Sequence, residues 1–307
     1  MGRLHPRLPL PPLVQEWAEA AAEGLFQPQG EIPFDFASPP GEEALVPACS
    51  LSWRIFKNPV ALFIGGVAAV ILELAEPAVR TGVWEHSSFR DDPVRRLQRT
   101  GRAAMITVYG ARSRAEAMIA GVVRLHERIH GTTPSGEPFR ADDPALLAWV
   151  QATASYGFAQ ATHRYVRPLD GRARDVFCRE GLAAARLYGA ASAPASETER
   201  RALFDSMRTR LEPSPIIFDF LSIMREAQAF PGPLAGLQRL LLRAAIEITP
   251  AWVRRRLGLT KSFGLRSWET PIVRQAAGLA GSILLRSSPA VRSCLRLGLP
   301  ADYLYRD

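Results

Sequence analysis

Cysteine is scarce in this chain, with only Cys49, Cys178 and Cys294 among 307 residues. They have neither the close spacing of metal ligands nor the even number of a disulfide framework, which favours inert thiols in a reducing compartment. The N-terminal sequence also lacks an apolar run of signal-peptide length, because prolines interrupt it. We therefore expect a cytoplasmic protein.

Sequence motifs for common ligand classes are missing as well. There is no glycine-rich phosphate loop, internal repeat or low-complexity tract. Lys and Arg number 38 against 30 acidic residues, a net charge of +8, and Arg dominates the basic set. The basic residues are scattered and no nucleic-acid motif accompanies them, so we expect no nucleic-acid partner.

A long uninterrupted hydrophobic run is also missing. Residues 59–79 have about the length of a bilayer span, but Glu73, Glu76 and Pro77 interrupt the second half. We expect this segment to be a buried core helix of a soluble protein. Peripheral membrane contact stays open, because it is the most apolar stretch of the chain.

Helix signals dominate what is present. Asp-Pro and Thr-Pro pairs and a Ser-x-x-Glu capping box open one amphipathic segment after another, while alternating strands are scarce. Only residues 104–108 could be either strand or helix. The pattern predicts an all-α fold with a single, mainly helical domain at 51–307. Residues 1–50, rich in Pro and Gly, are expected to form an irregular arm with one short helix at 12–24. The other helix starts are expected at 91–93, 113, 142–144, 170, 196, 234, 249–250 and 270–271.

His126 is the most informative residue. Residues 113–131 read as one helix, with a capping box of Ser113 and Glu116. On that helix His126 continues the apolar stripe of Ala115 and Ile119, so the imidazole is expected to be buried and to need a partner. That partner is either a core carbonyl or carboxylate, or a metal such as haem iron.

The same helix carries a second pattern. The stretch from His126 through Glu127 to His130 matches H-E-x-x-H, in which two His one turn apart bind zinc and the Glu acts as general base. The pattern is short, and no downstream third ligand stands out. A zinc-dependent hydrolase therefore remains an alternative, as does a metal-free helical binding protein.

Arg96 and Thr100 form another candidate pair. They are four residues apart, so on a helix they face the same way, with Arg99 beside them. They belong either to a solvated basic helix or to an inward-facing cluster that holds an anionic group. Arg suits the second task because it stays charged and presents a planar fork to a carboxylate, such as a haem propionate.

The ordered set of motifs between residues 50 and 165 resembles the latex-clearing protein (rubber oxygenase) and MpaB-type oxygenase family. No single piece is specific, but the order and the spacing together are. The motifs are Asn58-Pro59, Gly65-Gly66, His86-Ser87-Ser88-Phe89, Asp92-Pro93, Arg96-x-x-x-Thr100, Tyr109-Gly110, His126-x-x-x-x-Gly131, and Ala141-x-Asp143-Pro144 leading to Trp149-Val150.

The resemblance implies a helical protein that binds haem b. It places the proximal iron ligand on His126, and Arg96 and Thr100 in the haem pocket. In some rubber-cleaving relatives a Lys before the Thr caps the iron on the distal side. Here that residue is Arg99, whose guanidinium is not expected to deprotonate and bind iron.

Two further departures affect the expected chemistry. Glu76 stands where many relatives have a His between Ala and Pro, and Gln151 replaces a His after the Trp. Glu76 would have a raised pKa or pair with a cation such as Arg96, and could act as a distal base. We expect a haem b-dependent oxygenase that uses O2 on a small apolar substrate, isoprenoid or lipid-like. His126 is its metal ligand, Arg96 and Thr100 bind the cofactor, and Arg99 and Glu76 are the catalytic candidates. The sequence leaves the oligomeric state undetermined.

Overall fold

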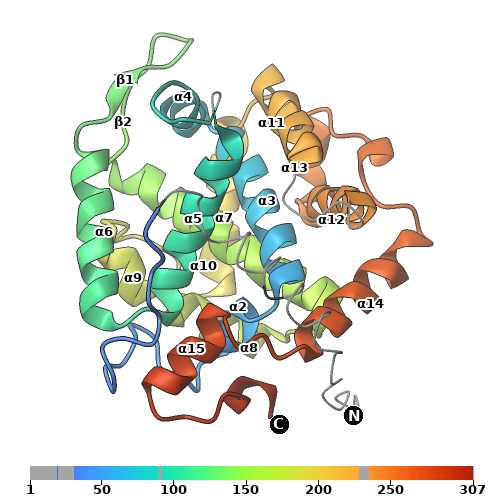
Figure 1. Ribbon diagram of the computed structural model, residues 1–307. Helices are drawn as coiled ribbons and strands as arrows, with labels where there is room; N and C mark the ends of the chain where they lie inside the picture. Colours follow the sequence, from blue (N-terminus) through green and yellow to red (C-terminus); the bar gives the residue numbers. More distant parts are fainter. Residues whose placement is uncertain (1–18, 20–30, 90–91, 228–234, 307) are drawn as a thin grey trace.

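The computed structural model describes residue 19 and residues 31–89, 92–227 and 235–306 (Figure 1). Within these ranges the fold is mainly helical, and a single β-hairpin is the only sheet. This confirms the expected all-α fold class. Residues 31–50 contain no helix or strand, and all but one residue of the helix expected at 12–24 lie outside the described part.

The elements follow one another along the chain with short connections. Short 3₁₀ turns lie at Met207–Thr209, Lys261–Phe263 and Tyr303–Tyr305, and a π-helical turn at Thr162–Val166 extends the seventh helix. The longer elements are α2 (Leu51–Phe56), α3 (Pro59–Leu74), α4 (Pro77–Glu85), α5 (Pro93–Tyr109), α6 (Arg112–His126), β1 (His130–Thr132), β2 (Pro138–Arg140), α7 (Pro144–Ala161), α8 (Gly171–Glu180), α9 (Leu182–Leu187), α10 (Glu197–Ser206), α11 (Pro215–Glu226), α12 (Ala235–Ile248), α13 (Ala251–Arg256), α14 (Glu269–Ser282) and α15 (Pro289–Arg296).

Aspartate caps explain where two of the site-forming helices begin. The side chain of Asp92 accepts a hydrogen bond from the Arg95 amide at 3.2 Å, and Pro93 then opens α5. Asp143 accepts from two amides, at 2.8 and 3.1 Å, and Pro144 opens α7. These bonds satisfy amides that have no partner within the helix, so both predicted starts are confirmed. The ambiguous residues 104–108 lie within α5 and are helical.

The helix that carries His126 differs from the prediction at both ends. Its N-cap residue is Ala111, which provides no side-chain bond. Ser113 instead uses its amide and its hydroxyl to bind the carboxylate of Glu42, at 2.5 and 2.9 Å. The predicted capping box is therefore wrong, because a partner from a distant segment takes the serine. The helix ends at His126, since the chain then turns into the hairpin of β1 and β2, which the sequence pattern did not reveal.

Two glycines bring the central helices α3 and α7 into backbone contact. A Cβ on Gly65 would lie 2.9 Å from the backbone carbon and oxygen of Gly157, and a Cβ on Gly157 would overlap the Gly65 carbonyl oxygen. Such a close crossing needs a residue without a side chain in both helices. Figure 1 shows α3 and α7 at the centre, with α5 and α6 on one side and α11 to α14 on the other.

The core forms on both sides of these central helices. One cluster joins α3 and α7 to α11, α12, α13 and α14, with Trp149 and Phe220 among its fully buried side chains. The other joins the segment before α2 to α5, α6, α8 and α15, around Trp53 and Tyr109. The helix expected at residues 59–79 is thus a core helix, as predicted, although it ends at Leu74 and α4 leaves at an angle of 108°.

The membrane test gives a limited result. No single helix in the described part of the chain has both the length and the apolar content to cross a bilayer. The bent pair of α3 and α4 meets the criterion only when the two helices are taken together.

One stripe of α3 is not covered by its neighbours. Pro59, Phe63, Gly66, Val70 and Glu73 are half-buried, whereas every other residue of α3 is buried. Their spacing of four, three, four and three places them on one face of the helix. A Cβ added at Gly66 would meet no atom within 4 Å. This face of the central helix is therefore only partly covered, and it is open at Gly66.

The two adjacent glycines of α3 give a direct test of this packing. We expect Gly65→Ala, whose Cβ would contact the α7 backbone, to lower the free energy of unfolding by ~3 kcal/mol through overpacking. Gly66→Ala is the matched control and should raise stability by ~0.5 kcal/mol or more, since alanine favours the helix and the space is empty. Urea unfolding of both variants measures the difference. Equal effects would show that α3 and α7 do not meet as described.

Candidate functional site

Glu73 is the one charged residue within α3, and its side chain is half-buried. Burial raises the pKa of its carboxyl to about 7, against the opposing effects of the Arg96 charge and a hydrogen bond with Thr153. The hydroxyl of Thr153 lies 3.3 Å from Oε1 of Glu73 and 2.8 Å from the carbonyl of Val150. A protonated Glu73 can donate to Thr153 while Thr153 donates to Val150.

Arg96 and Thr100 lie on the facing part of α5. The guanidinium of Arg96 donates to the hydroxyl of Thr100, which is also 3.0 Å from the Arg96 carbonyl oxygen. Burial lowers the pKa of Arg96 and the Glu73 charge raises it, but an arginine remains protonated. Arg96 and Glu73 make no direct ion pair with each other. Thr100, one turn further along, is exposed.

His126 completes the group from the C-terminal end of α6. Its side chain is half-buried, and its Nδ1 atom is inaccessible to solvent and has no hydrogen-bond partner in the described part of the chain. Burial and then the charge of Arg96 lower the pKa of the imidazole, and Asp142 partly offsets them. His126 is therefore neutral at pH 7, which leaves one ring nitrogen free to bind a metal.

The helices that carry Arg96 and His126 are only partly covered near these side chains. None of the residues 93–104 of α5 is buried, nor is any of the residues 120–126 of α6. The charge of Arg96 lowers the pKa of both Glu73 and His126 although no bond joins these side chains in the described chain, and Glu73 itself belongs to the half-buried stripe of α3. This combination indicates a partly covered region bordered by α3, α5 and α6, which we call the hollow. It brings together three of the predicted site residues, Arg96, Thr100 and His126.

The residues around the hollow fit a haem. An unpartnered buried imidazole nitrogen is unfavourable unless it is satisfied by a ligand, and neutral imidazole is a common iron ligand. The apolar stripe of α3 suits the face of a porphyrin, and the guanidinium of Arg96 suits a propionate.

The zinc alternative is not supported by this geometry. Helix α6 ends at His126, and His130 is exposed at the start of β1. The two imidazoles therefore do not lie on successive turns of one helix, as the H-E-x-x-H pattern requires. Within the described ranges there is also no cluster of three or more His, Cys, Asp or Glu side chains that could bind a metal ion.

Arg99 lies outside this group. Its guanidinium pairs with the carboxylate of Glu31 at 2.8 Å, and its side chain is 57% exposed. Arg95 and Arg102, on the same face of α5, bind the same carboxylate. Glu31 thus fixes the segment before α2 to the outer face of α5. Arg99 therefore stabilises that contact through Glu31. Its side chain does not lie with Arg96 and His126, so the structure does not support its predicted catalytic role.

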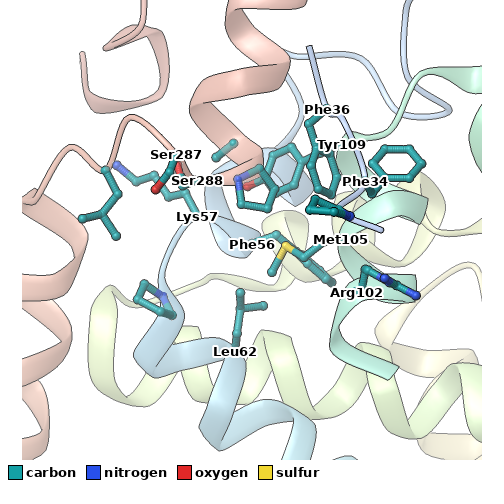
Figure 2. A pocket seen from close by; sticks show the side chains of 15 residues that line it. Phe34, Phe36, Phe56, Lys57, Leu62, Arg102, Met105, Tyr109, Ser287 and Ser288 are labelled. Atoms are coloured by element: carbon teal, nitrogen blue, oxygen red, sulfur yellow. The ribbon is translucent and has the colours of Figure 1, made fainter. Parts of the chain in front are cut away.

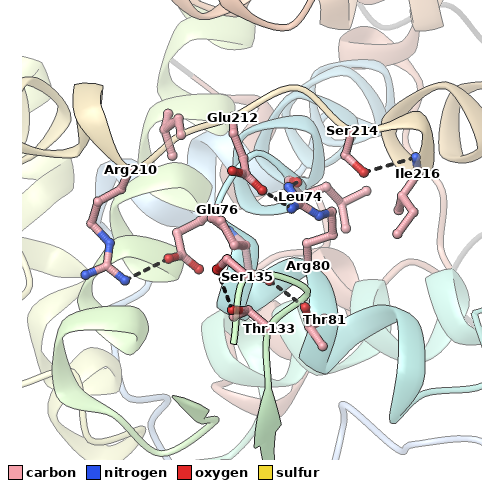
Figure 3. A network of polar contacts seen from close by, with 12 residues as sticks. Leu74, Glu76, Arg80, Thr81, Thr133, Ser135, Arg210, Glu212, Ser214 and Ile216 are labelled. Carbon is pink, nitrogen blue, oxygen red and sulfur yellow. Dashed lines mark hydrogen bonds and ion pairs between the residues drawn. The ribbon is translucent and has the colours of Figure 1, made fainter. Parts of the chain in front are cut away.

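Glu76 also has a different position from the one expected. Figure 3 shows its carboxylate between Arg210 and the start of α4. It pairs with Arg210 at 3.0 Å, not with Arg96, and it caps α4 by accepting from the Val79 amide at 2.8 Å. Arg80 stabilises the same corner by bonding the Leu74 carbonyl at 3.2 Å. Glu76 therefore stabilises the bend between α3 and α4. The predicted pairing of Glu76 with Arg96 is wrong, since its partner is Arg210.

Glu73 is the site residue that the sequence reasoning missed. It was noted only as a break in an apolar segment. A signal was present, however, because it is the single charge in a helix that is otherwise apolar, and such a charge needs a special environment. Choosing it over Glu76 requires knowing that the helix ends between them.

The raised pKa of Glu73 predicts a pH-dependent stability. Below pH 4.5 the carboxyl is protonated in both the folded and the unfolded chain, so it has no effect; between pH 4.5 and 7 the unfolded chain ionises first, and stability is lost as pH rises. Glu73→Gln mimics the protonated form. We expect its gain in unfolding free energy over the wild type to grow by ~2 kcal/mol from pH 5 to pH 8. Glu85→Gln, an exposed carboxylate on α4, is the control. A gain independent of pH would contradict the assignment.

Comparisons with known proteins agree with this description. The family model described as "ER-bound oxygenase mpaB/B'/Rubber oxygenase, catalytic domain" matches residues 53–281. No curated protein and no solved structure gives a significant match. The matched residues run from α2 into the end of α14 and include Glu73, Arg96 and His126. Because the match covers three quarters of the chain, it confirms the resemblance in the motifs, and the chain belongs to the mpaB and rubber oxygenase family of oxygenase catalytic domains.

Proposed function

We propose that this protein is a haem b-dependent oxygenase that uses O2 to oxidise a small apolar substrate, isoprenoid or lipid-like. The observation that carries the proposal is the buried Nδ1 atom of His126, which has no protein partner in the described part of the chain. Membership of an oxygenase family supports the reaction class.

The residues of the hollow have distinct tasks in this proposal. His126 binds the iron through an imidazole kept neutral by burial and by Arg96. Arg96, positioned by Thr100, binds a propionate. Pro59, Phe63 and Val70 exclude water and present an apolar wall to the substrate. When bound, the haem supplies the oxygen chemistry.

Glu73 is suited to hold or accept a proton. A carboxyl with a pKa of about 7 is half protonated near neutral pH, which is the condition for efficient general acid–base catalysis. Thr153 orients it through the 3.3 Å contact. We propose that Glu73, and neither Glu76 nor Arg99, is the titratable group beside the substrate. Glu73 lies on the half-buried stripe of α3 that borders the hollow, whereas Arg99 pairs with Glu31 and Glu76 pairs with Arg210.

A pair of histidine variants tests haem binding. The protein purified from haem-replete cells should show a Soret band, and His126→Ala should remove most of it because the iron loses its ligand. His130→Ala, four residues away and exposed, should leave the band unchanged. Metal analysis of the same samples should find iron and no stoichiometric zinc. A colourless wild type, or equal loss in both variants, would refute the proposal. O2 uptake with squalene then tests the substrate class.

Two adjacent arginines separate cofactor binding from surface charge. Arg96→Leu should lower haem retention by ~10-fold, since a buried charge-assisted bond to a propionate is lost. Arg95→Leu removes the same charge from the outer face, where the side chain is 45% exposed, and should retain haem normally. Haem transfer to apomyoglobin measures both rates. Faster transfer from both variants would mean that overall charge, and not the position of Arg96, holds the cofactor.

A further inference from the structure

A second cavity lies at the other end of α3. It has a volume of about 100 Å³ and is lined by the end of α2, the start of α3, α5, the segment before α2, and the loop that leads into α15 (Figure 2). Its walls are mainly apolar. The apolar lining residues are Pro33, Phe34, Phe36, Phe56, Pro59, Leu62, Met105, Tyr109, Leu285, Pro289 and Ala290.

The charged residues in the lining of this cavity are Lys57 and Arg102, of which Arg102 is already paired with Glu31. Lys57, Ser287 and Ser288 lie together on one side in Figure 2, and Arg102 lies on the opposite side. No aspartate or glutamate lines the cavity. An apolar interior with a cationic and hydroxyl edge is complementary to an amphiphile with an anionic head.

Lys57 has bonding capacity to spare. Its ammonium donates to the Leu304 carbonyl at 2.9 Å and lies 4.1 Å from the centre of the Tyr305 ring. An ammonium has three N–H donors, so at least one remains for a ligand. Within the described chain it has no carboxylate partner. Burial, with the charges of Arg54 and Arg167, lowers its pKa to about 8. An anion would relieve both the desolvation and the repulsion.

The N-terminus of α15 adds to the same edge. Ser288 caps this helix by accepting from the Val291 amide, and Pro289 follows with no N–H of its own. Helix N-termini carry a partial positive charge that favours anions. Ser287, exposed just before the cap, offers a hydroxyl at the rim of the cavity.

Pro59 is shared by this cavity and by the stripe of α3 that ends at Glu73. It lines the cavity and is also the first residue of the uncovered stripe of α3. From Pro59 to Glu73 the helix rises about 21 Å. The cavity is smaller than the roughly 150 Å³ that holds a benzene molecule. It can therefore take a head group and its first carbons, while a longer chain must continue along the stripe.

We propose that this cavity binds the anionic head group of a long-chain carboxylate, whose apolar chain continues along the stripe of α3 toward Glu73. The proposal rests on the proposed function in that it names the class of apolar substrate. The binding itself does not require haem, so it can be tested independently.

Calorimetric titration with oleate and with oleyl alcohol, below the micelle concentration of oleate, tests the site. The full-length protein should bind oleate at least ~10-fold more tightly than the alcohol, because only the carboxylate forms a charge-assisted bond. Lys57→Met should abolish this preference, and Lys57→Arg should retain it. The chain contains one other lysine, and Lys261→Met, on an exposed residue, is the matched control that should bind like the wild type.

A second variant protects the test against misfolding. Ser287→Asp places a negative charge on an exposed residue at the rim and should weaken oleate without changing the alcohol. Equal affinity of the wild type for both ligands, or equal loss in Lys57→Met and Lys261→Met, overturns the site. The same titration on His126→Ala should match the wild type. A Soret band without a preference for oleate refutes this inference alone, and the reverse result refutes the haem proposal alone.

Discussion

The backbone contact between Gly65 and Gly157 is the constraint on which the site depends. It fixes how closely α3 and α7 approach and which face of α3 is used to do so. Thr153 stands one turn before Gly157 and meets Glu73, about two turns after Gly65. Because one face of α3 is taken by this crossing, the stripe from Pro59 to Glu73, roughly a third of a turn away, faces the open space. The close packing of two helices thus determines where the fold stays open.

Within that space, a few charges are balanced without direct pairing. Burial raises the pKa of the Glu73 carboxyl and lowers the pKa of the His126 imidazole, so both groups favour their neutral forms. Arg96 stays charged. Below about pH 7, where Glu73 is mostly protonated, Arg96 is one cation beside two neutral groups, and the hollow carries a net positive charge. Such a site is unfavourable when empty, because a buried charge needs a counter-ion. Under the proposed function, a haem propionate would supply one.

Much of the fold was readable from the sequence because its determinants are local. Asp92-Pro93 and Asp143-Pro144 each contain both the cap and the first turn of a helix, so their starts follow from adjacent residues. Ser113 has the same chemistry, yet its partner Glu42 lies far away in sequence and removes it from the helix end. The hairpin after His126 could not be predicted for a different reason: its strands are only three residues long and have no alternating sequence pattern.

The candidate site shows the same division. Arg96, Thr100 and His126 could be selected because helical spacing and family motifs both point to them, and the fold gathers them. The choice between Glu73 and Glu76 could not be made in this way. The two residues are three positions apart, so on a continuous helix both would lie on the same face. The helix instead ends at Leu74, and Pro77 begins a new direction with Glu76 as its cap. A bend of 108° therefore leaves the Glu73 carboxylate beside Thr153 of α7 and takes the Glu76 carboxylate to Arg210. Their different roles follow from where the helix stops, since the two side chains have the same chemistry.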